Sequence, residues 1–219
     1  MLRRPVLIAC LLSACLHTVS CSADPQQSAQ GDQLDKRVRQ FLDSRSDTWR
    51  DMNVPEEDGK TLHDLILKHR YTRALEIGTS TGHSGIWMAW ALAKTGGKLI
   101  TIEIDEQRHK EAVANFREAG LADYIDARLA DAHELVPKLP GPIDFVFADA
   151  DKEWSQNYMK AVLPKMTVGG CYVTHNVSDR MWRRWGWVAE YIDFLKKQPN
   201  LETTYDYAGG GMSISYKRK

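Results

Sequence analysis

The spacing of apolar residues divides the chain into a helical opening segment and a longer stretch in which strands and helices alternate. Between Asp32 and Arg45, apolar residues recur at helical spacing and share one face: Leu34, Val38, Phe41 and Leu42. A second amphipathic helix is predicted from Glu56 to Lys68, with Leu62, Leu65 and Ile66 facing inward. Two helices are therefore expected before the first strand.

From residue 74 onward, short apolar runs are separated by longer helical stretches. The predicted strands are Ala74–Ile77, Leu99–Ile102, Tyr124–Ala127, Ile143–Phe147 and Cys171–Thr174, with two more near 202–207 and 211–217. The predicted helices between them cover about 85–95, 106–118, 152–165 and 180–197. Strands that alternate with helices form βαβ units. The pattern predicts an α/β fold with a Rossmann-like, doubly wound, mostly parallel sheet of seven strands.

Polar and glycine-containing segments directly follow five of these predicted strands. They are Gly78–Ser84, Glu103, Asp131, Asp149–Lys152 and His175–Asn176. Open α/β sheets bind ligands beyond the carboxyl ends of their strands. The functional site is therefore expected where these segments meet.

The amino-acid composition bears on which kinds of molecule the protein could bind. The 219 residues carry 29 basic and 29 acidic side chains, so the formal net charge is zero. Such a chain gives no electrostatic reason to expect a nucleic acid or an anionic membrane as partner. Three of the four cysteines lie within the first 21 residues, and the remaining Cys171 is expected to be a packed core residue.

The first 21 residues are typical of a lipoprotein signal peptide. Arg3 and Arg4 precede an apolar run that is too short to span a bilayer. Cys21 and Cys15 both stand in lipobox-like contexts, and residues 22–31 are polar like a tether. We expect residues 32–219 to form the domain, exported and lipid-anchored in the periplasm. The alternative is translation from a later start and a cytoplasmic protein.

The loop after the first strand, from Glu76 to Ser84, has the features of a cofactor turn. Gly78 and Gly82 permit a tight turn and a close approach of the backbone to a ligand. The G-x-G-x-x-G pattern of dinucleotide-binding enzymes is absent, which argues against a nicotinamide dehydrogenase. Glu103 ends the second strand, where a carboxylate can accept both ribose hydroxyls of an adenosine.

Four motifs resemble the cation-dependent O-methyltransferases, the family of catechol and caffeoyl-CoA O-methyltransferases. They are Met52-Asn-Val54, Glu76-x-Gly78-x3-Gly82-x-Ser84, Ile100-Thr-Ile-Glu-Ile104 and Phe147-Ala-Asp-Ala-Asp-Lys152. The resemblance runs from about Met52 to Lys217. It implies a class I methyltransferase fold with S-adenosylmethionine at the switch point, and methyl transfer to a hydroxyl of a small aromatic molecule.

The resemblance also assigns residues to the cofactor. Val54, Gly78 and Ser84 are expected at the methionine end and Glu103 at the ribose. Asp131, Ala132 and His133 are expected near the adenine. The predicted set is completed by Glu76, Ser80, Gly82, His83 and Asp149. Ser80 and His83 stand where the catechol enzyme has tyrosines.

The residues after the fourth and fifth predicted strands would form the reacting end of the site, where the methyl group is transferred. There, the resemblance makes Asp149 a metal ligand and Lys152 the base. The alternative is that Asp149 is a helix cap and Lys152 a surface charge. A bound divalent cation would polarise the acceptor hydroxyl and lower its pKa. His175-Asn176 stands where the family has Asp-Asn, both ligands. Imidazole suits Zn²⁺ or Mn²⁺ better than Mg²⁺. Either the metal changes, with Asp149, His175 and Asn176 as ligands, or His175 acts as the base without a metal.

Two features leave the acceptor open. Met212 lies near the position of a late acidic residue in the catechol enzyme, which argues against a catechol. The segment from Asp179 to Trp187 holds three tryptophans and three arginines. These side chains are expected either to stack on an aromatic, anionic acceptor or to pack against the core or the mate of a homodimer.

A different class of function also stays open. Export would separate the protein from cytosolic S-adenosylmethionine, and His175 departs from the family pattern. Both features fit an exported, non-catalytic ligand-binding protein on a decayed methyltransferase fold. The sequence pattern still favours the enzyme, because all the strand-following segments carry suitable chemistry.

The signal-peptide hypothesis predicts the mass of the mature protein. We expect the first residue to be a lipid-modified Cys21 or Cys15, recovered with the membrane fraction and identified by mass spectrometry. An unprocessed chain starting at Met1, or a start further along, would contradict export.

Overall fold

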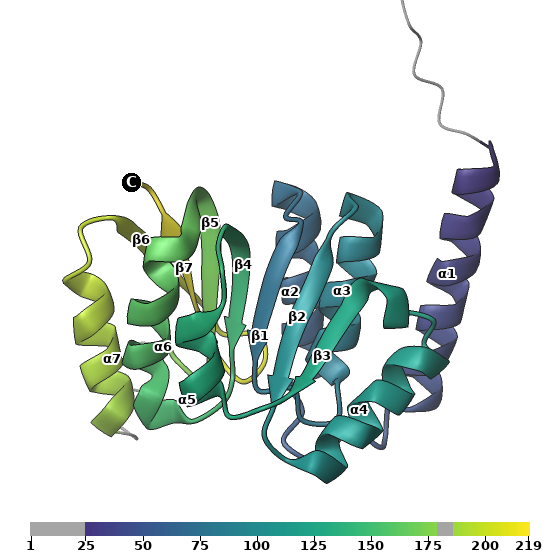
Figure 1. The fold of residues 1–219 in the computed structure, drawn as a ribbon, viewed down its shortest axis with the longest axis horizontal. Coiled ribbons are helices and arrows are strands. Elements are labelled where there is room, and N and C mark those ends of the chain that lie inside the picture. The colour runs from purple at the N-terminus through teal and green to yellow at the C-terminus, as the bar shows by residue number, and fades with distance from the viewer. Residues whose placement is uncertain (1–24, 179–185) are drawn as a thin grey trace, which may run out of the picture.

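The computed structural model describes residues 25–178 and 186–219, which form one seven-stranded sheet with helices on both faces (Figure 1). The strands are β1 (Arg73–Ile77), β2 (Lys98–Glu103), β3 (Ile125–Leu129), β4 (Ile143–Ala148), β5 (Met166–His175), β6 (Leu201–Asp206) and β7 (Met212–Lys217). Their order across the sheet is β3-β2-β1-β4-β5-β7-β6. Strands β1 to β5 pair in parallel with one another, whereas β7 pairs antiparallel with β5 and β6. The predicted fold class is confirmed.

The helices follow the predicted alternation. They are α1 (Pro25–Ser44), α2 (Glu56–His69), α3 (His83–Thr95), α4 (Glu106–Glu118), α5 (Ala132–Leu135), α6 (Ser155–Val162) and α7 (Gly186–Lys196). Short 3₁₀ turns cover Ala122–Tyr124, Val136–Lys138, Lys152–Trp154 and Leu163–Lys165. Within the described ranges, no helix is both long and apolar enough to cross a membrane.

Alternate residues of the central strands serve two cores, which explains why these strands are almost continuously apolar. On one face Leu75 and Tyr172 pack with α5, α6 and α7. On the other face Phe147 and Val173 pack with α2 and α3. A parallel sheet covered on both faces needs apolar side chains in both directions. Cys171 is fully buried in the second core, as expected.

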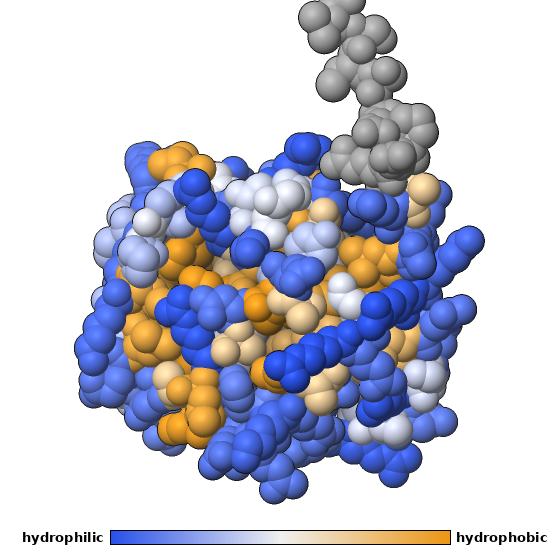
Figure 2. All heavy atoms as spheres, turned by 45° about the vertical axis from the view of Figure 1, so that its right-hand side comes forward, coloured by the Kyte–Doolittle hydropathy of each residue, from blue (hydrophilic) through white to orange (hydrophobic). Residues whose placement is uncertain are grey.

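A third core joins α1, α3 and α4. Val38 and Phe41 of α1 meet Trp90 of α3, and Phe116 of α4 closes the cluster. Figure 1 places α1 at the outer edge of the molecule, beside α4. Figure 2 shows the surface on this side, where apolar patches lie between charged side chains. The first predicted helix is thus an integral part of the domain.

Several boundaries differ from those expected. Helix α1 begins at Pro25 instead of Asp32, so it takes in most of the expected tether. The glutamines and alanine of that stretch are good helix formers, which offsets the roughly 1 kcal/mol cost of Gly31. The short helix α5 was not expected. The predicted signal peptide and residues 179–185 of the tryptophan- and arginine-rich segment lie outside the described residues.

A glutamate lies inside this framework without a charged partner. Glu76 of β1 is fully buried and accepts hydrogen bonds from Ser84 Oγ and Thr101 Oγ1, each at 2.5 Å. Burial raises the pKa of Glu76 from about 4.5 to about 8, because the two hydroxyl donors only partly offset the loss of water. At neutral pH the side chain is therefore mainly the uncharged acid.

This raised pKa makes stability depend on pH. Between about pH 4.5 and 8 the folded protein holds a proton on Glu76 that the unfolded chain has lost, so stability falls as pH rises, by up to roughly 1.4 kcal/mol per unit. Urea unfolding at several pH values should show that Glu76→Gln loses this part of the slope. Parallel pH profiles of wild type and variant would contradict the assignment.

Candidate active site

The strand-following segments meet at one edge of the sheet, as expected. Gly78 follows β1 with φ +95° and lies directly against the loop that follows β4. A Cβ at Gly78 would lie 2.7 Å from the backbone oxygen of Asp149, so a side chain here would displace one loop or the other. Gly78 therefore joins the predicted cofactor turn to the predicted reacting end.

The glycine turn is fixed to the end of β2 by a carboxylate. Glu103 accepts hydrogen bonds from the backbone N–H of Ser80 at 2.7 Å, Ile104 at 3.0 Å and Asp105 at 2.9 Å. Its side chain is buried at the edge of the sheet. Gly82, with φ +99°, caps α3 where a Cβ would meet the Phe116 ring at 2.7 Å. Glu103 and the turn thus form one rigid unit.

Two large apolar side chains are exposed to solvent at the same edge of the sheet. Ile104, directly after Glu103, is 68% exposed, and Leu129 at the end of β3 is 48% exposed. Large apolar side chains exposed beside a buried carboxylate are a typical surface for the flat face of a ligand. The sequence analysis missed both residues, because an apolar residue at a strand end looks like part of the core.

The predicted adenine segment lies at the start of α5. Asp131 caps this short helix by accepting a hydrogen bond from the His133 N–H at 2.8 Å. The His133 ring stacks on Trp154, with the ring centroids 3.8 Å apart. Ala132, between Asp131 and His133, is buried. The backbone N–H of Ala130 donates to Glu103 O at 2.8 Å, which places this segment beside Glu103.

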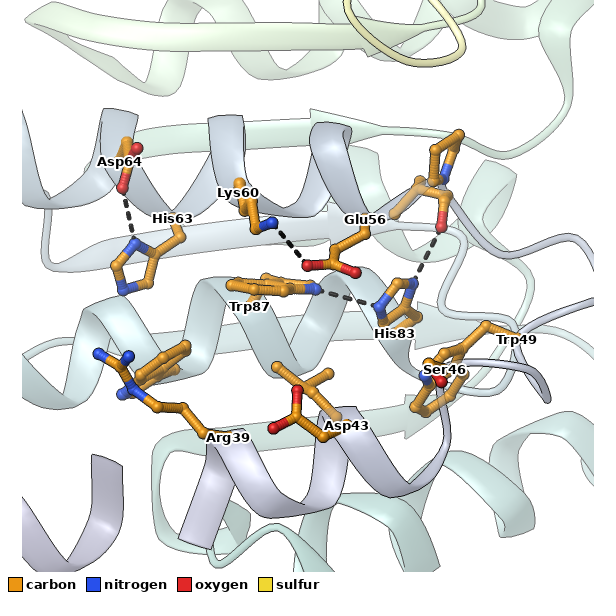
Figure 3. Close-up of a pocket in the computed structure, with 14 residues that line it drawn as sticks. Arg39, Asp43, Ser46, Trp49, Glu56, Lys60, His63, Asp64, His83 and Trp87 are labelled. Atoms are coloured by element: carbon orange, nitrogen blue, oxygen red, sulfur yellow. Dashed lines mark hydrogen bonds and ion pairs between the residues drawn. The ribbon is translucent and has the colours of Figure 1, made fainter. Parts of the chain in front are cut away.

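His83 points away from this edge. Its Nδ1 donates to Val54 O at 2.9 Å, and its Nε2 accepts from Trp87 Nε1 at 3.0 Å. The ring stacks on Trp49 and lines a cavity of about 490 Å³ between α1, α2 and α3 (Figure 3). Burial lowers the pKa of the His83 imidazole. The predicted cofactor role of this side chain is therefore not supported, since α3 turns it to the helical face of the domain.

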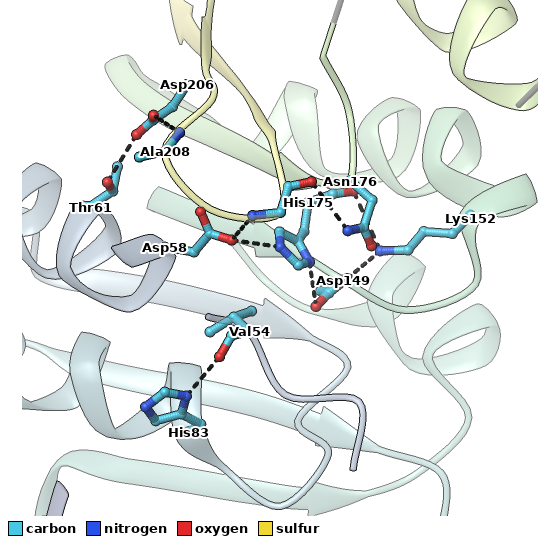
Figure 4. A network of polar contacts seen from close by, with 11 residues as sticks. Val54, Asp58, Thr61, His83, Asp149, Lys152, His175, Asn176, Asp206 and Ala208 are labelled. Carbon is cyan, nitrogen blue, oxygen red and sulfur yellow. Dashed lines mark hydrogen bonds and ion pairs between the residues drawn. The ribbon is translucent and has the colours of Figure 1, made fainter. Parts of the chain in front are cut away.

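At the reacting end, four charged side chains form a chain of polar contacts (Figure 4). Lys152 Nζ donates to Asp149 Oδ1, and the His175 Nδ1 lies 3.0 Å from Asp149 Oδ2. The His175 Nε2 lies 2.9 Å from Asp58 Oδ2. Asn176 follows with φ +58°, and its amide donates to Gly210 O at 3.4 Å. The structure thus brings Asp149, Lys152, His175 and Asn176 together, as predicted.

Asp58 was missed by the sequence analysis. It lies in the first turn of α2, where an acidic residue normally stabilises the helix dipole from the surface. In the structure it is completely buried and 117 residues away in sequence from its partner His175. Nothing local distinguishes it from Glu56 and Glu57, its exposed neighbours.

His175, as it is placed here, does not fit a divalent cation. Both ring nitrogens of His175 face carboxylates, and both oxygens of Asp149 face nitrogen donors. An imidazole binds a metal through the lone pair of an unprotonated ring nitrogen, and both nitrogens of His175 are taken up by carboxylates. The misfit therefore lies with His175, since the oxygens of Asp149 keep further lone pairs. Within residues 25–178 and 186–219, no cluster of three or more His, Cys, Asp or Glu side chains has the arrangement of a metal site.

Comparison with known proteins places this geometry in a family. The O-methyltransferase family model matches residues 25–201. A catechol O-methyltransferase of Niastella koreensis is 36% identical over 130 residues, 58% of each chain. A flavonoid 3′,5′-methyltransferase of Vitis vinifera is 29% identical over 204 residues, 82% of this chain and 84% of the relative. The chain thus spans little more than half the length of the first of these relatives.

Solved structures support the same fold. The O-methyltransferase from Streptomyces achromogenes involved in tomaymycin synthesis, in complex with SAM, superposes with a TM-score of 0.71 at 24% identity. The superposition covers 92% of this chain and 93% of that one. With the family model matching most of its length, the chain belongs to the O-methyltransferase family.

Proposed function

We propose that the protein transfers a methyl group from S-adenosylmethionine to a hydroxyl oxygen of a small molecule. One observation carries the proposal. The Glu103 carboxylate and the glycine turn form one unit through Ser80, and Gly78 sets that unit directly against Asp149. A carboxylate suited to a ribose and a polar reacting centre therefore lie at adjoining strand ends, as a methyl transfer requires.

The edge of the sheet fits the proposed cofactor. Glu103 would accept the ribose hydroxyls, and the exposed side chains of Ile104 and Leu129 would cover the adenine. The turn, which lacks side chains at Gly78 and Gly82, would let the methionine end approach the backbone. The similar Streptomyces achromogenes enzyme was solved in complex with SAM, which supports SAM as the cofactor proposed here.

When bound, S-adenosylmethionine supplies an electrophilic methyl group, and its sulfur leaves as a neutral thioether that keeps the bonding electron pair. The chain must align the acceptor oxygen and receive its proton. Lys152 in its unprotonated form would take that proton, since the adjacent Asp149 carboxylate stabilises the resulting ammonium. Alignment alone can contribute about 7–11 kcal/mol to such a reaction.

The relatives are named for catechol and flavonoid acceptors, both aromatic hydroxyl compounds. We therefore propose an aromatic hydroxyl compound as the acceptor class. The non-catalytic alternative gains no support from the site, because Lys152, Asp149 and Asn176 are all retained around the reacting end. Export and lipid anchoring stay part of the proposal and rest on the sequence of residues 1–21 alone.

Cofactor binding can be tested without knowing the acceptor. Titration calorimetry with S-adenosylhomocysteine should show binding to wild type, and Glu103→Ala should weaken it at least tenfold because the ribose loses its acceptor. The matched control is Glu106→Ala, an exposed helix residue paired with Lys110, which should bind like wild type. Equal affinity of Glu103→Ala and wild type would refute the assignment.

Methyl transfer can be tested with a panel of phenols, catechols and flavonoids, following the formation of S-adenosylhomocysteine. With any accepted compound, Lys152→Met should reduce kcat by about 100-fold, as expected for loss of a general base. Its affinity for S-adenosylhomocysteine should stay within twofold of wild type. An unchanged kcat would exclude Lys152 as the base.

A further inference from the structure

We propose that the buried Asp58–His175–Asp149 group occupies the place of a divalent cation, so that the protein transfers methyl groups without a metal. The inference rests on the proposed methyltransferase function and defines how its reacting end is built. In it, His175 is a fixed cation and neither a metal ligand nor the base. Asp58 is a positioning residue that acts through His175.

The geometry around the imidazole carries the proposal. Its two ring nitrogens lie 2.9 Å from Asp58 Oδ2 and 3.0 Å from Asp149 Oδ2. Ionised carboxylates are acceptors only, so a ring that satisfies both must carry a proton on each nitrogen. Such an imidazolium has no lone pair for a metal. His175 thus meets the two carboxylates as a cation.

The charges balance without an added ion. In the resting protein, Asp58 and Asp149 supply two negative charges, and His175 and Lys152 supply two positive ones. Lys152 must release its proton before it can act as the base. Hydrogen bonds to the two carboxylates take the place of water around the charged ring. Asp149 in turn lies between two nitrogen groups, Lys152 Nζ and His175 Nδ1. A divalent cation added here would meet two existing cations.

A glycine loop between β6 and β7 closes over this pair. The Gly210 N–H donates to Asp58 Oδ2 at 2.7 Å. A Cβ at Gly209 would lie 2.3 Å from Asp58 Oδ1, and one at Gly210 would lie 2.5 Å from His175 Nε2. Asp58 is 0% exposed and His175 is 5% exposed. The loop is therefore shaped to the pair, and a hydrated ion would have to displace it.

The arrangement also accounts for the position of the base. Asp149 uses one oxygen to bind the imidazolium and the other to hold Lys152, whose side chain is 27% exposed. Asp58 thus acts at a distance: it fixes His175, His175 fixes Asp149, and Asp149 holds Lys152 toward the open side. The proton of the acceptor hydroxyl passes to Lys152 as the new C–O bond forms and the C–S bond breaks.

The first experiment measures metal binding and metal dependence of the intact protein. In an EPR titration, Mn²⁺ should bind wild type no more tightly than millimolar. Methylation of any accepted phenol should stay within twofold after EDTA treatment and dialysis. Micromolar, stoichiometric Mn²⁺ binding, or a tenfold loss of activity restored by Mn²⁺, Mg²⁺ or Zn²⁺, would overturn the proposal. Calorimetry with S-adenosylhomocysteine reports the proposed function separately.

The second experiment restores an oxygen donor set. Combining His175→Asp with Asp58→Asn leaves carboxylates at 149 and 175 beside Asn176, ligands that suit Mg²⁺ and Mn²⁺. This double variant should bind Mn²⁺ at least tenfold more tightly than wild type. Equal Mn²⁺ affinity of the two proteins would count against the proposal. The wild-type titration decides alone if the double variant does not fold.

The third experiment tests Asp58 as a positioning residue. Asp58→Asn should lower kcat at least tenfold while KM for S-adenosylmethionine stays within twofold, because Asp58 is not part of the proposed cofactor seat at Glu103 and the glycine turn. The control is Thr61→Val, which removes a 2.9 Å hydrogen bond from the same helix to Asp206 and should leave kcat unchanged. Equal kcat in Asp58→Asn and wild type would overturn the role of Asp58.

Discussion

The burial of a parallel sheet on both faces is the constraint on which the rest of this structure depends. Helices cover β1, β4 and β5 on either side, so their side chains are apolar in both directions. Polar chemistry is left to the edge where the strands end, and glycine turns allow the loops to meet there without side chains between them. The proposed cofactor seat and reacting end adjoin because Gly78 contacts Asp149.

Two carboxylates near this edge, Glu76 and Asp149, differ in their charge at neutral pH. Glu76 has only hydroxyl donors, so burial raises its pKa to about 8 and the acid is mainly neutral at pH 7. The Asp149 side chain is 13% exposed, and Lys152 and His175 keep it ionised. Neighbouring cations, more than depth, thus decide which carboxylate carries charge. The neutral Glu76 is hydrogen-bonded within the core to Ser84 and Thr101, and the charged Asp149 lies at the reacting end.

The substitution at 175 is best understood together with its surroundings. An imidazole in place of a carboxylate ligand brings a second carboxylate, Asp58, to its far nitrogen. The space for that contact depends on Gly209 and Gly210, where side chains would collide with both partners. These residues come from α2, β5 and the β6–β7 loop, and they meet only in the folded domain. The proposed loss of the metal is therefore a property of the whole group.

The sequence by itself determined the order of strands and helices, the glycine turn, Glu103 and the residues after β4 and β5, because apolar periodicity and strand-end chemistry are local signals. Tertiary structure alone decided that His83 faces the α1–α2–α3 cavity and that Ile104 is exposed. It also decided the partners of His175. Asp58 looks like an ordinary first-turn acid, since its burial depends on a contact 117 residues away, which no local pattern of side chains encodes.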